Sequence, residues 1–181
     1  HLSGDAVADK VKSIALGLMT LGVAAGDRVA VIAENRPEWS ITDLAVLSLR
    51  AVNIPIYTTQ AVDQIRYIIE DSGAKVLLIS GKKLWKHAEE AIRSCEVIEK
   101  IVFFDDDFLP ENESRAVGLN EVEGRGIRFA RNNPDEFENR LSALQPDDLA
   151  TVIYTSGTTG EPKGVMLTQD RKSTRLNSSH E

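Results

Sequence analysis

Val29-Ala30-Val31-Ile32-Ala33 is a short, wholly apolar segment rich in β-branched residues, and its surroundings indicate the fold. Such a run is typical of a strand buried between two layers of helices. Pro37 follows shortly after it and suits the first turn of a helix, where its missing N–H is harmless. This helix is expected to extend to about Arg50. A buried strand followed directly by a helix is the first half of a β-α-β unit.

The alternation of strand and helix continues on both sides of this segment. Before it, apolar residues recur at three- and four-residue steps from Val7 to Leu21, which indicates a helix that Gly22 can end. After it, the pattern predicts strands at 54–57, 75–79 and 100–104 and helices at 61–71 and 84–94. Strands joined by such helices need crossovers, which are almost always right-handed. We therefore predict an α/β fold with a parallel sheet flanked by helices on both faces.

Between Asp105 and Pro146 the pattern weakens into scattered acidic residues and two glycines, Gly124 and Gly126. We interpret this segment as a largely irregular connection. One helix is expected within it, at 135–144, and an apolar strand is expected after it, at 149–154. This last strand leads into the segment that carries the functional signal.

Size and charge limit the class of protein. The 181 residues, 42% of them hydrophobic, suffice for one compact domain or two small subdomains. With 21 Lys and Arg against 28 Asp and Glu, the net charge of -7 argues against a nucleic-acid partner. The longest apolar stretches fall far short of the roughly 20 residues that cross a bilayer. The single cysteine, Cys95, cannot form an internal disulfide, so we expect a reducing, cytoplasmic compartment.

A loop rich in glycine and hydroxyl groups follows the last expected strand. Between Tyr154 and Gly164 it carries four Ser and Thr hydroxyls, three glycines and Lys163. Glycines let backbone N–H groups converge on phosphate oxygens, hydroxyls add donors or a metal ligand, and lysine adds a positive charge. The loop is not a Walker A motif, because Lys163 follows Pro162 and precedes a strand-like run. On composition alone, an ordinary hairpin turn is the commoner explanation.

The segment YTSGTTGEPKGVMLT, residues 154–168, resembles the phosphate-loop signature of the adenylate-forming (AMP-binding) superfamily, which includes acyl-CoA synthetases, luciferases and peptide-synthetase adenylation domains. The resemblance extends to residues 17–39, GLMTLGVAAGDRVAVIAENRPEW, and to residues 51–78, AVNIPIYTTQAVDQIRYIIEDSGAKVLL. Both of these segments are similar to long-chain fatty-acid CoA ligases. The resemblance implies that residues 1–169 are part of the N-terminal AMP-binding domain of such a ligase.

The resemblance also implies a set of site residues and a reaction. The positions that match the family's phosphate loop are Thr155, Ser156, Gly157, Thr158, Thr159, Gly160 and Lys163. Thr158 matches the position whose hydroxyl can join the Mg²⁺ shell. In the implied reaction a fatty carboxylate attacks the α-phosphate of ATP, and CoA then displaces AMP. The expected small molecules are therefore a fatty acid, ATP, Mg²⁺ and CoA as co-substrate.

The family's catalytic lysine is not among these residues, so we expect the ligase activity to belong to a longer parent protein and the chain alone to be inactive. Two alternatives stay open: another adenylate-forming enzyme, such as a peptide-synthetase or aryl-acid module, and a non-catalytic α/β nucleotide-binding domain. Peripheral contact with a membrane is also left open, because long-chain acids partition into bilayers. The sequence sets neither the acyl-chain length nor the oligomeric state.

Reactive and aromatic side chains outside the loop are expected to be structural. His87 has no second His or Cys at ligand spacing, and Cys95 has no Cys-x-x-Cys partner. The acidic run 105–107 lacks the pattern of a calcium loop. Trp39 and Trp85 fall within apolar helical patterns, which favours core packing over ligand stacking.

The apolar periodicity of the sequence is lost in its last residues. From Asp170 to His180 the segment DRKSTRLNSSH shows no apolar periodicity, and it resembles the translation of a sequencing-library adapter. We therefore expect residues 170–181 to be an artefactual tail. The chain begins with His1 instead of Met and shows no targeting pattern, so we expect it to start inside a longer reading frame.

Overall fold

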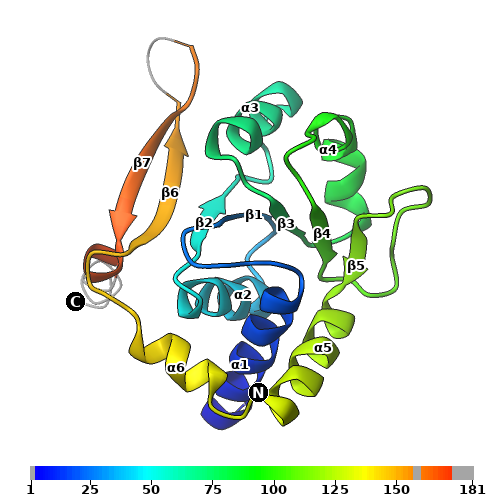
Figure 1. Cartoon of the computed structure of the whole chain (residues 1–181). Coiled ribbons are helices and arrows are strands. Elements are labelled where there is room, and N and C mark those ends of the chain that lie inside the picture. Colours follow the sequence, from blue (N-terminus) through cyan, green and yellow to red (C-terminus); the bar gives the residue numbers. More distant parts are fainter. Residues whose placement is uncertain (1–2, 157–159, 173–181) are drawn as a thin grey trace.

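The elements of the computed structural model, which describes residues 3–156 and 160–172, form a seven-stranded sheet with helices on both faces (Figure 1). In chain order they are α1 (Gly4–Thr20), β1 (Arg28–Ile32), α2 (Pro37–Ser48), β2 (Val52–Pro55), α3 (Val62–Ser72), β3 (Val76–Ile79), α4 (Lys82–Ser94), β4 (Lys100–Phe103), β5 (Ala116–Gly118), α5 (Leu119–Asn132), α6 (Glu136–Ser142), β6 (Leu149–Thr155) and β7 (Lys163–Thr168). The predicted α/β fold is confirmed.

The strand order in the sheet is β5-β4-β3-β1-β2-β6-β7. All neighbours from β5 to β6 pair in parallel, as predicted, and β7 pairs antiparallel with β6. The reversal at β7 has a simple cause: residues 156–162 are too few for the crossover that a parallel partner requires, whereas an antiparallel partner needs only a hairpin. The loop that the sequence singles out is therefore the turn of this hairpin.

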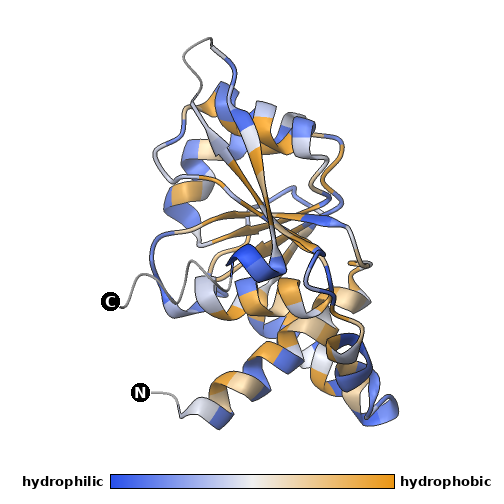
Figure 2. Ribbon diagram, turned by 90° about the vertical axis from the view of Figure 1, so that its left-hand side faces the viewer, coloured by the Kyte–Doolittle hydropathy of each residue, from blue (hydrophilic) through white to orange (hydrophobic). Residues whose placement is uncertain are grey.

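Side chains of the central strands point alternately into two apolar layers. On β1, Val29 and Val31 pack against the layer formed by α1, α2, α5 and α6, whereas Ala30 and Ile32 face α3 and α4. Successive side chains of a strand point to opposite faces, so a strand covered on both sides must be apolar throughout. The orange colour of the strands between the helical layers in Figure 2 shows this pattern.

The segment between β4 and α6 differs from the prediction. Where an irregular connection was expected, the structure contains β5 and the 14-residue helix α5. One of its two glycines serves the packing of α5 on α1: a Cβ at Gly126 would lie 1.7 Å from the carbonyl oxygen of Ser13. On the facing helix, a Cβ at Gly17 would lie 2.0 Å from the carbonyl oxygen of Val122. The two helices thus approach too closely for any side chain at these positions.

Several other predicted boundaries move by a few residues, two of them beside β2. β2 begins at Val52 instead of residue 54, because the Val52 amide already donates a 2.8 Å hydrogen bond to the Asp27 carbonyl beside β1. α2 ends at Ser48, and Arg50 adopts a left-handed conformation with φ 58°. The Arg50 guanidinium donates two hydrogen bonds of 2.8 Å to the Asp148 carboxylate. This contact ties the turn before β2 to the base of β6.

Candidate functional site

The predicted phosphate loop follows the carboxyl end of β6 (Figure 1). Because β6 runs parallel to β2 and β2 runs parallel to β1, the carboxyl ends of all three strands lie at the same edge of the sheet. Open α/β sheets bind their ligands outside this edge. The fold therefore places the loop where a ligand is expected.

The described part of the loop presents polar side chains to solvent. Thr155, Ser156, Gly160 and Lys163 are exposed. Thr155 pairs with Lys163 across the hairpin, so the first hydroxyl residue and the lysine of the loop lie on adjacent strands, directly opposite each other. Gly160 has φ 109°, a conformation that favours glycine.

The remaining predicted residues of the loop, Gly157, Thr158 and Thr159, lie outside the described residues. The assignment of Thr158 as a Mg²⁺ ligand therefore stays a prediction. Within residues 3–156 and 160–172, no group of three or more His, Cys, Asp or Glu side chains is arranged to hold a metal ion.

Two hydrogen bonds attach the hairpin to neighbouring elements. Near the base of β6, the buried Thr151 hydroxyl donates to the Asn53 carbonyl on β2 at 2.8 Å. At the end of β6, the Tyr154 hydroxyl donates to the Asp71 carboxylate on α3 at 2.6 Å. Burial raises the pKa of Tyr154, and the hydrogen bond to Asp71 raises it further. The phenol therefore remains protonated, and a donor, at neutral pH.

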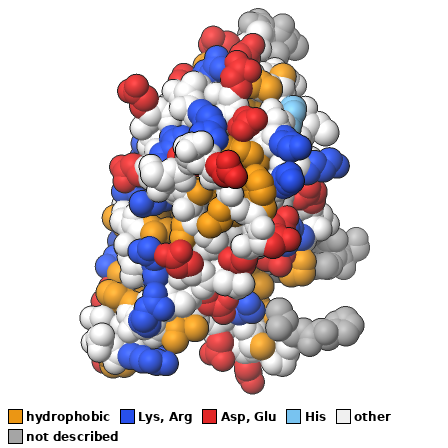
Figure 3. All heavy atoms as spheres, turned by 90° about the vertical axis from the view of Figure 1, so that its right-hand side faces the viewer, with side chains coloured by type: hydrophobic (Ala, Val, Ile, Leu, Met, Phe, Trp, Pro, Cys, Tyr) orange, Lys and Arg blue, Asp and Glu red, His pale blue; other side chains and the backbone are white. Residues whose placement is uncertain are grey.

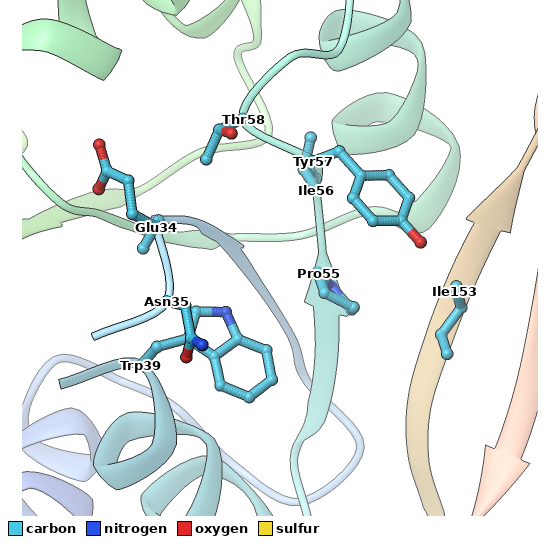
Figure 4. Close-up of a pocket in the computed structure, with 9 residues that line it drawn as sticks. Glu34, Asn35, Trp39, Pro55, Ile56, Tyr57, Thr58 and Ile153 are labelled. Carbon is cyan, nitrogen blue, oxygen red and sulfur yellow. The ribbon is translucent and has the colours of Figure 1, made fainter. Parts of the chain in front are cut away.

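A cleft of about 430 Å³ lies between the ends of β1 and β2 and the side of β6 (Figure 4). It is lined by Ala33, Glu34, Asn35, Trp39, Pro55, Ile56, Tyr57, Thr58 and Ile153. The helix after β1 packs on one face of the sheet and the helix after β2 on the other. The cleft thus occupies a point where connections diverge, a preferred ligand site in α/β folds.

Two aromatic side chains, Trp39 and Tyr57, line the cleft. Tyr57 is 65% exposed and extends toward Ile153, with Trp39 on the opposite side of Pro55 (Figure 4). Trp39 is half-buried: it contacts the core, as predicted, and also lines the cleft, which was not predicted. The sequence signal for Trp39 and Tyr57 is that of packing residues. Only the three-dimensional structure, in which both residues line one cleft, distinguishes them from ordinary packing residues.

Glu34 adds one carboxylate to the rim of the cleft. It accepts a 2.5 Å hydrogen bond from the Ser80 hydroxyl, at the end of β3. This hydrogen bond lowers the pKa of Glu34, so the side chain is ionised at neutral pH. In Figure 4 the carboxylate points away from Trp39, so the cleft is lined mostly by apolar side chains, with Asn35 and Thr58 as further polar residues.

Most of the other residues that the sequence analysis singled out have structural surroundings. Trp85 and Cys95 are buried, as predicted, and burial raises the pKa of the Cys95 thiol. His87 Nε2 lies 2.8 Å from the Gln60 carbonyl oxygen. Asp105 accepts a 2.8 Å hydrogen bond from Arg36. None of the described helices combines the length and apolar character needed to cross a membrane.

The sheet topology, the hairpin loop at its carboxyl edge and the adjoining cleft define an α/β protein with a candidate ligand site at that edge. Comparison with known families specifies the class further. The sequence pattern described as "AMP-binding enzyme" matches residues 1–180. The chain belongs to the AMP-binding enzyme family.

Two curated relatives of this chain are described as fatty-acid CoA ligases or synthetases. The chain is 38% identical over 162 residues to the long-chain-fatty-acid–CoA ligase FadD15 of Mycobacterium bovis, covering 90% of this chain and 25% of the relative. It is 34% identical over 168 residues to fatty acyl-CoA synthetase A of Dictyostelium discoideum, covering 88% of this chain and 23% of the relative. The chain thus spans about a quarter of the length of these curated relatives.

A solved structure shows the same fold. The crystal structure of coronafacic acid ligase from Pectobacterium brasiliense superposes with a TM-score of 0.76 at 21% identity. The match covers 93% of this chain and 30% of that one. The element order and sheet described above are therefore those of an established protein architecture.

Proposed function

We propose that these residues form part of an ATP-dependent ligase that joins a long-chain fatty acid to CoA. The proposal rests on one observation: Thr155, Ser156 and Lys163 stand together at the carboxyl end of β6, beside an apolar cleft. Membership of the AMP-binding enzyme family and the similarity to fatty-acid CoA ligases support it.

The donor set of the loop fits the phosphates of ATP. The hydroxyls of Thr155 and Ser156 and the ammonium group of Lys163 are exposed and belong to one turn. Hydroxyl donors and a lysine point charge suit phosphate oxygens. Mg²⁺, when bound with the nucleotide, would neutralise part of the phosphate charge, and Thr158 is the proposed protein ligand for it.

Two displacements make up the proposed reaction. In the first, a carboxylate oxygen of the fatty acid bonds to the α-phosphorus of ATP, and the bond from that phosphorus to the bridging oxygen breaks to release pyrophosphate. In the second, the sulfur of CoA bonds to the acyl carbon, AMP departs with the bonding electron pair, and the thiol proton passes to solvent. The fatty acid and CoA are thus substrates.

The loop residues serve the first displacement. Negative charge grows on the departing pyrophosphate while a carboxylate approaches a polyanion, so the barrier is largely electrostatic. Lys163 and the hydroxyls of Thr155 and Ser156, at the end of the β6–β7 hairpin, would stabilise that charge. Because the lysine that the resemblance assigns to catalysis is not among these residues, we propose that the 181-residue chain alone does not form acyl-CoA.

Exchange of labelled pyrophosphate into ATP tests the reaction and its substrate class. The full-length protein that contains these residues would be assayed with palmitate, with an aromatic acid and with amino acids in separate arms. We expect exchange that depends on palmitate. Exchange supported only by the aromatic acid or an amino acid would replace the substrate class, and no exchange with any acid would overturn the proposed reaction.

A further inference from the structure

Tyr154 stands directly before the first residue of the phosphate loop. Its side chain is only 7% exposed, although the neighbouring Thr155 is exposed. Its hydroxyl reaches across to α3 and donates a 2.6 Å hydrogen bond to Asp71, near the end of that helix. The contact joins two residues that are 83 positions apart in the sequence.

The ring of Tyr154 also lies against the strand that leaves the loop. Tyr154 pairs with Gly164 across the hairpin, one position beyond the pair of Thr155 and Lys163. A Cβ at Gly164 would lie 3.3 Å from Cζ of Tyr154 and 2.7 Å from Cγ1 of Val152. Glycine therefore leaves room for the ring. A single side chain thus contacts both ends of the loop, just before Thr155 and just after Lys163.

Backbone pairing with β2 holds the base of the hairpin, three residues before Tyr154. β6 pairs with β2 at Thr151 and Asn53, whereas β6 and β7 pair with each other from Leu149 to Thr155. A cavity of about 330 Å³ lies beside α3 and the hairpin, with Asp71, Tyr154 and Gly164 in its lining. The Tyr154 side chain belongs to the same buried cluster as Ile65 and Ile69 of α3, and beside this cavity its hydroxyl spans the remaining distance to Asp71.

We infer that Tyr154 is a positioning residue for the phosphate loop: its hydrogen bond to Asp71 and its ring against Gly164 hold Thr155 and Lys163 in place for the phosphates of ATP. The inference deepens the proposed function and rests on it. Tyr154 acts through its neighbours and does not touch substrate.

The charges around the phenol are compatible with this role. Asp71 and Tyr67 of α3 raise the pKa of Tyr154, in addition to the larger effect of burial, and Arg28 opposes them. The phenol thus donates to Asp71 throughout the neutral pH range.

Steady-state kinetics of the full-length enzyme test this role. Replacing Tyr154 by Phe removes the hydroxyl and keeps the ring, and we expect the KM for ATP to rise about tenfold, with the KM for the fatty acid unchanged. Asp71→Asn keeps an acceptor oxygen and should retain a near wild-type KM for ATP. The matched control is Tyr67→Phe, which removes a hydroxyl from the same helix and should leave both constants unchanged. A merely structural role would lower the melting temperature without changing the KM for ATP.

Hydrogen exchange on the same full-length proteins gives a readout that does not depend on activity. In Tyr154→Phe, amides of residues 152–155 and 163–166 should exchange about tenfold faster, and those of β1 and β3 at the wild-type rate. Unchanged hairpin exchange, or an unchanged KM for ATP in an active enzyme, overturns the inference. If the wild type shows no acid-dependent pyrophosphate exchange, the proposed function fails, and hydrogen exchange still decides whether Tyr154 holds the hairpin.

Discussion

Arg115 shows how single residues tie distant elements together. Its guanidinium donates hydrogen bonds of 2.7 and 2.8 Å to the Glu113 carboxylate, and it also donates to the carbonyls of Cys95 and Ile98 after α4. The Glu113 side chain is 5% exposed. The hydrogen bond from Arg115 is the largest influence on the pKa of Glu113 and holds it below its usual value. The pair fastens the end of α4 to the entry of β5.

Removing the negative partner of this pair should destabilise the protein. We expect Glu113→Gln to lower the free energy of unfolding at pH 7 by about 1–3 kcal/mol, because the largely buried guanidinium loses its charged acceptor. Urea denaturation measures the change. Glu111→Gln, at an exposed position two residues away, is the matched control and should change stability by less than about 0.5 kcal/mol.

The pH dependence of the same pair follows from the direction of the pKa shift. Because the folded-state pKa of Glu113 is depressed, its contribution to stability is complete above the unfolded-state pKa, about 4.3, and is lost as the pH falls through the folded-state value. The stabilities of the wild type and Glu113→Gln should therefore converge in acid. A gap that stays constant down to pH 3 would contradict this account.

At the scale of elements, the contact between α1 and α5 depends on glycine. Gly126 faces the backbone of Ser13, and Gly17 faces the backbone of Val122. Gly124 belongs to the same helix α5, but a Cβ there would meet only the end of the Arg128 side chain, at 3.5 Å. The two glycines of α5 therefore differ in their surroundings, although they look equivalent in the sequence.

Alanine substitutions distinguish the two positions. Gly126→Ala forces the helices apart, and we expect overpacking to cost about 1–3 kcal/mol or more, exceeding the gain of about 1 kcal/mol in helix propensity. Gly124→Ala keeps the gain without the clash and should stabilise the protein. Urea denaturation measures both variants. Equal stability of the two variants would show that α1 and α5 do not approach as closely as described.

The contrast between α5 and the other elements shows what the sequence can predict. The strands at 29–33 and 75–79 and the helices between them were predictable, because a buried strand is apolar on both faces and an amphipathic helix repeats its apolar residues every three or four positions. In α5 the closest helix contact uses glycine, which carries no apolar signal. The prediction therefore treated Gly124 and Gly126 as signs of a loop.

At the scale of the whole molecule, the polar loop and the apolar cleft share one edge of the sheet. The place of the loop could be predicted because Thr155, Ser156 and Lys163 lie within one short segment of the sequence, whereas their role at the phosphates of ATP stays a prediction. The cleft could not, because its walls come from the segments that follow β1 and β2, from α2 and from the ends of β2 and β6, which are far apart in the sequence. The hydrogen bond between Tyr154 and Asp71 also gives no local signal, since its partners are far apart in the chain.

Charged side chains of both signs occur together on one face of the molecule. On the face shown in Figure 3, acidic and basic side chains are interspersed, with smaller apolar areas between them. The net charge of the chain is -7, and the positive charge of Lys163 is a local feature of the loop. The proposed binding of ATP phosphates by this acidic chain would therefore depend on that local arrangement.

The most direct test of the account is the rate of palmitate-dependent pyrophosphate exchange into ATP by the full-length enzyme carrying Lys163→Ala. Lys86→Ala, which removes an equal charge from the exposed side of α4, is the control. We predict a fall of about 100-fold for Lys163→Ala, the size expected for loss of one fixed group that stabilises transition-state charge. The control should show the wild-type rate. An unchanged exchange rate in Lys163→Ala would contradict the assignment of this loop to the phosphates of ATP.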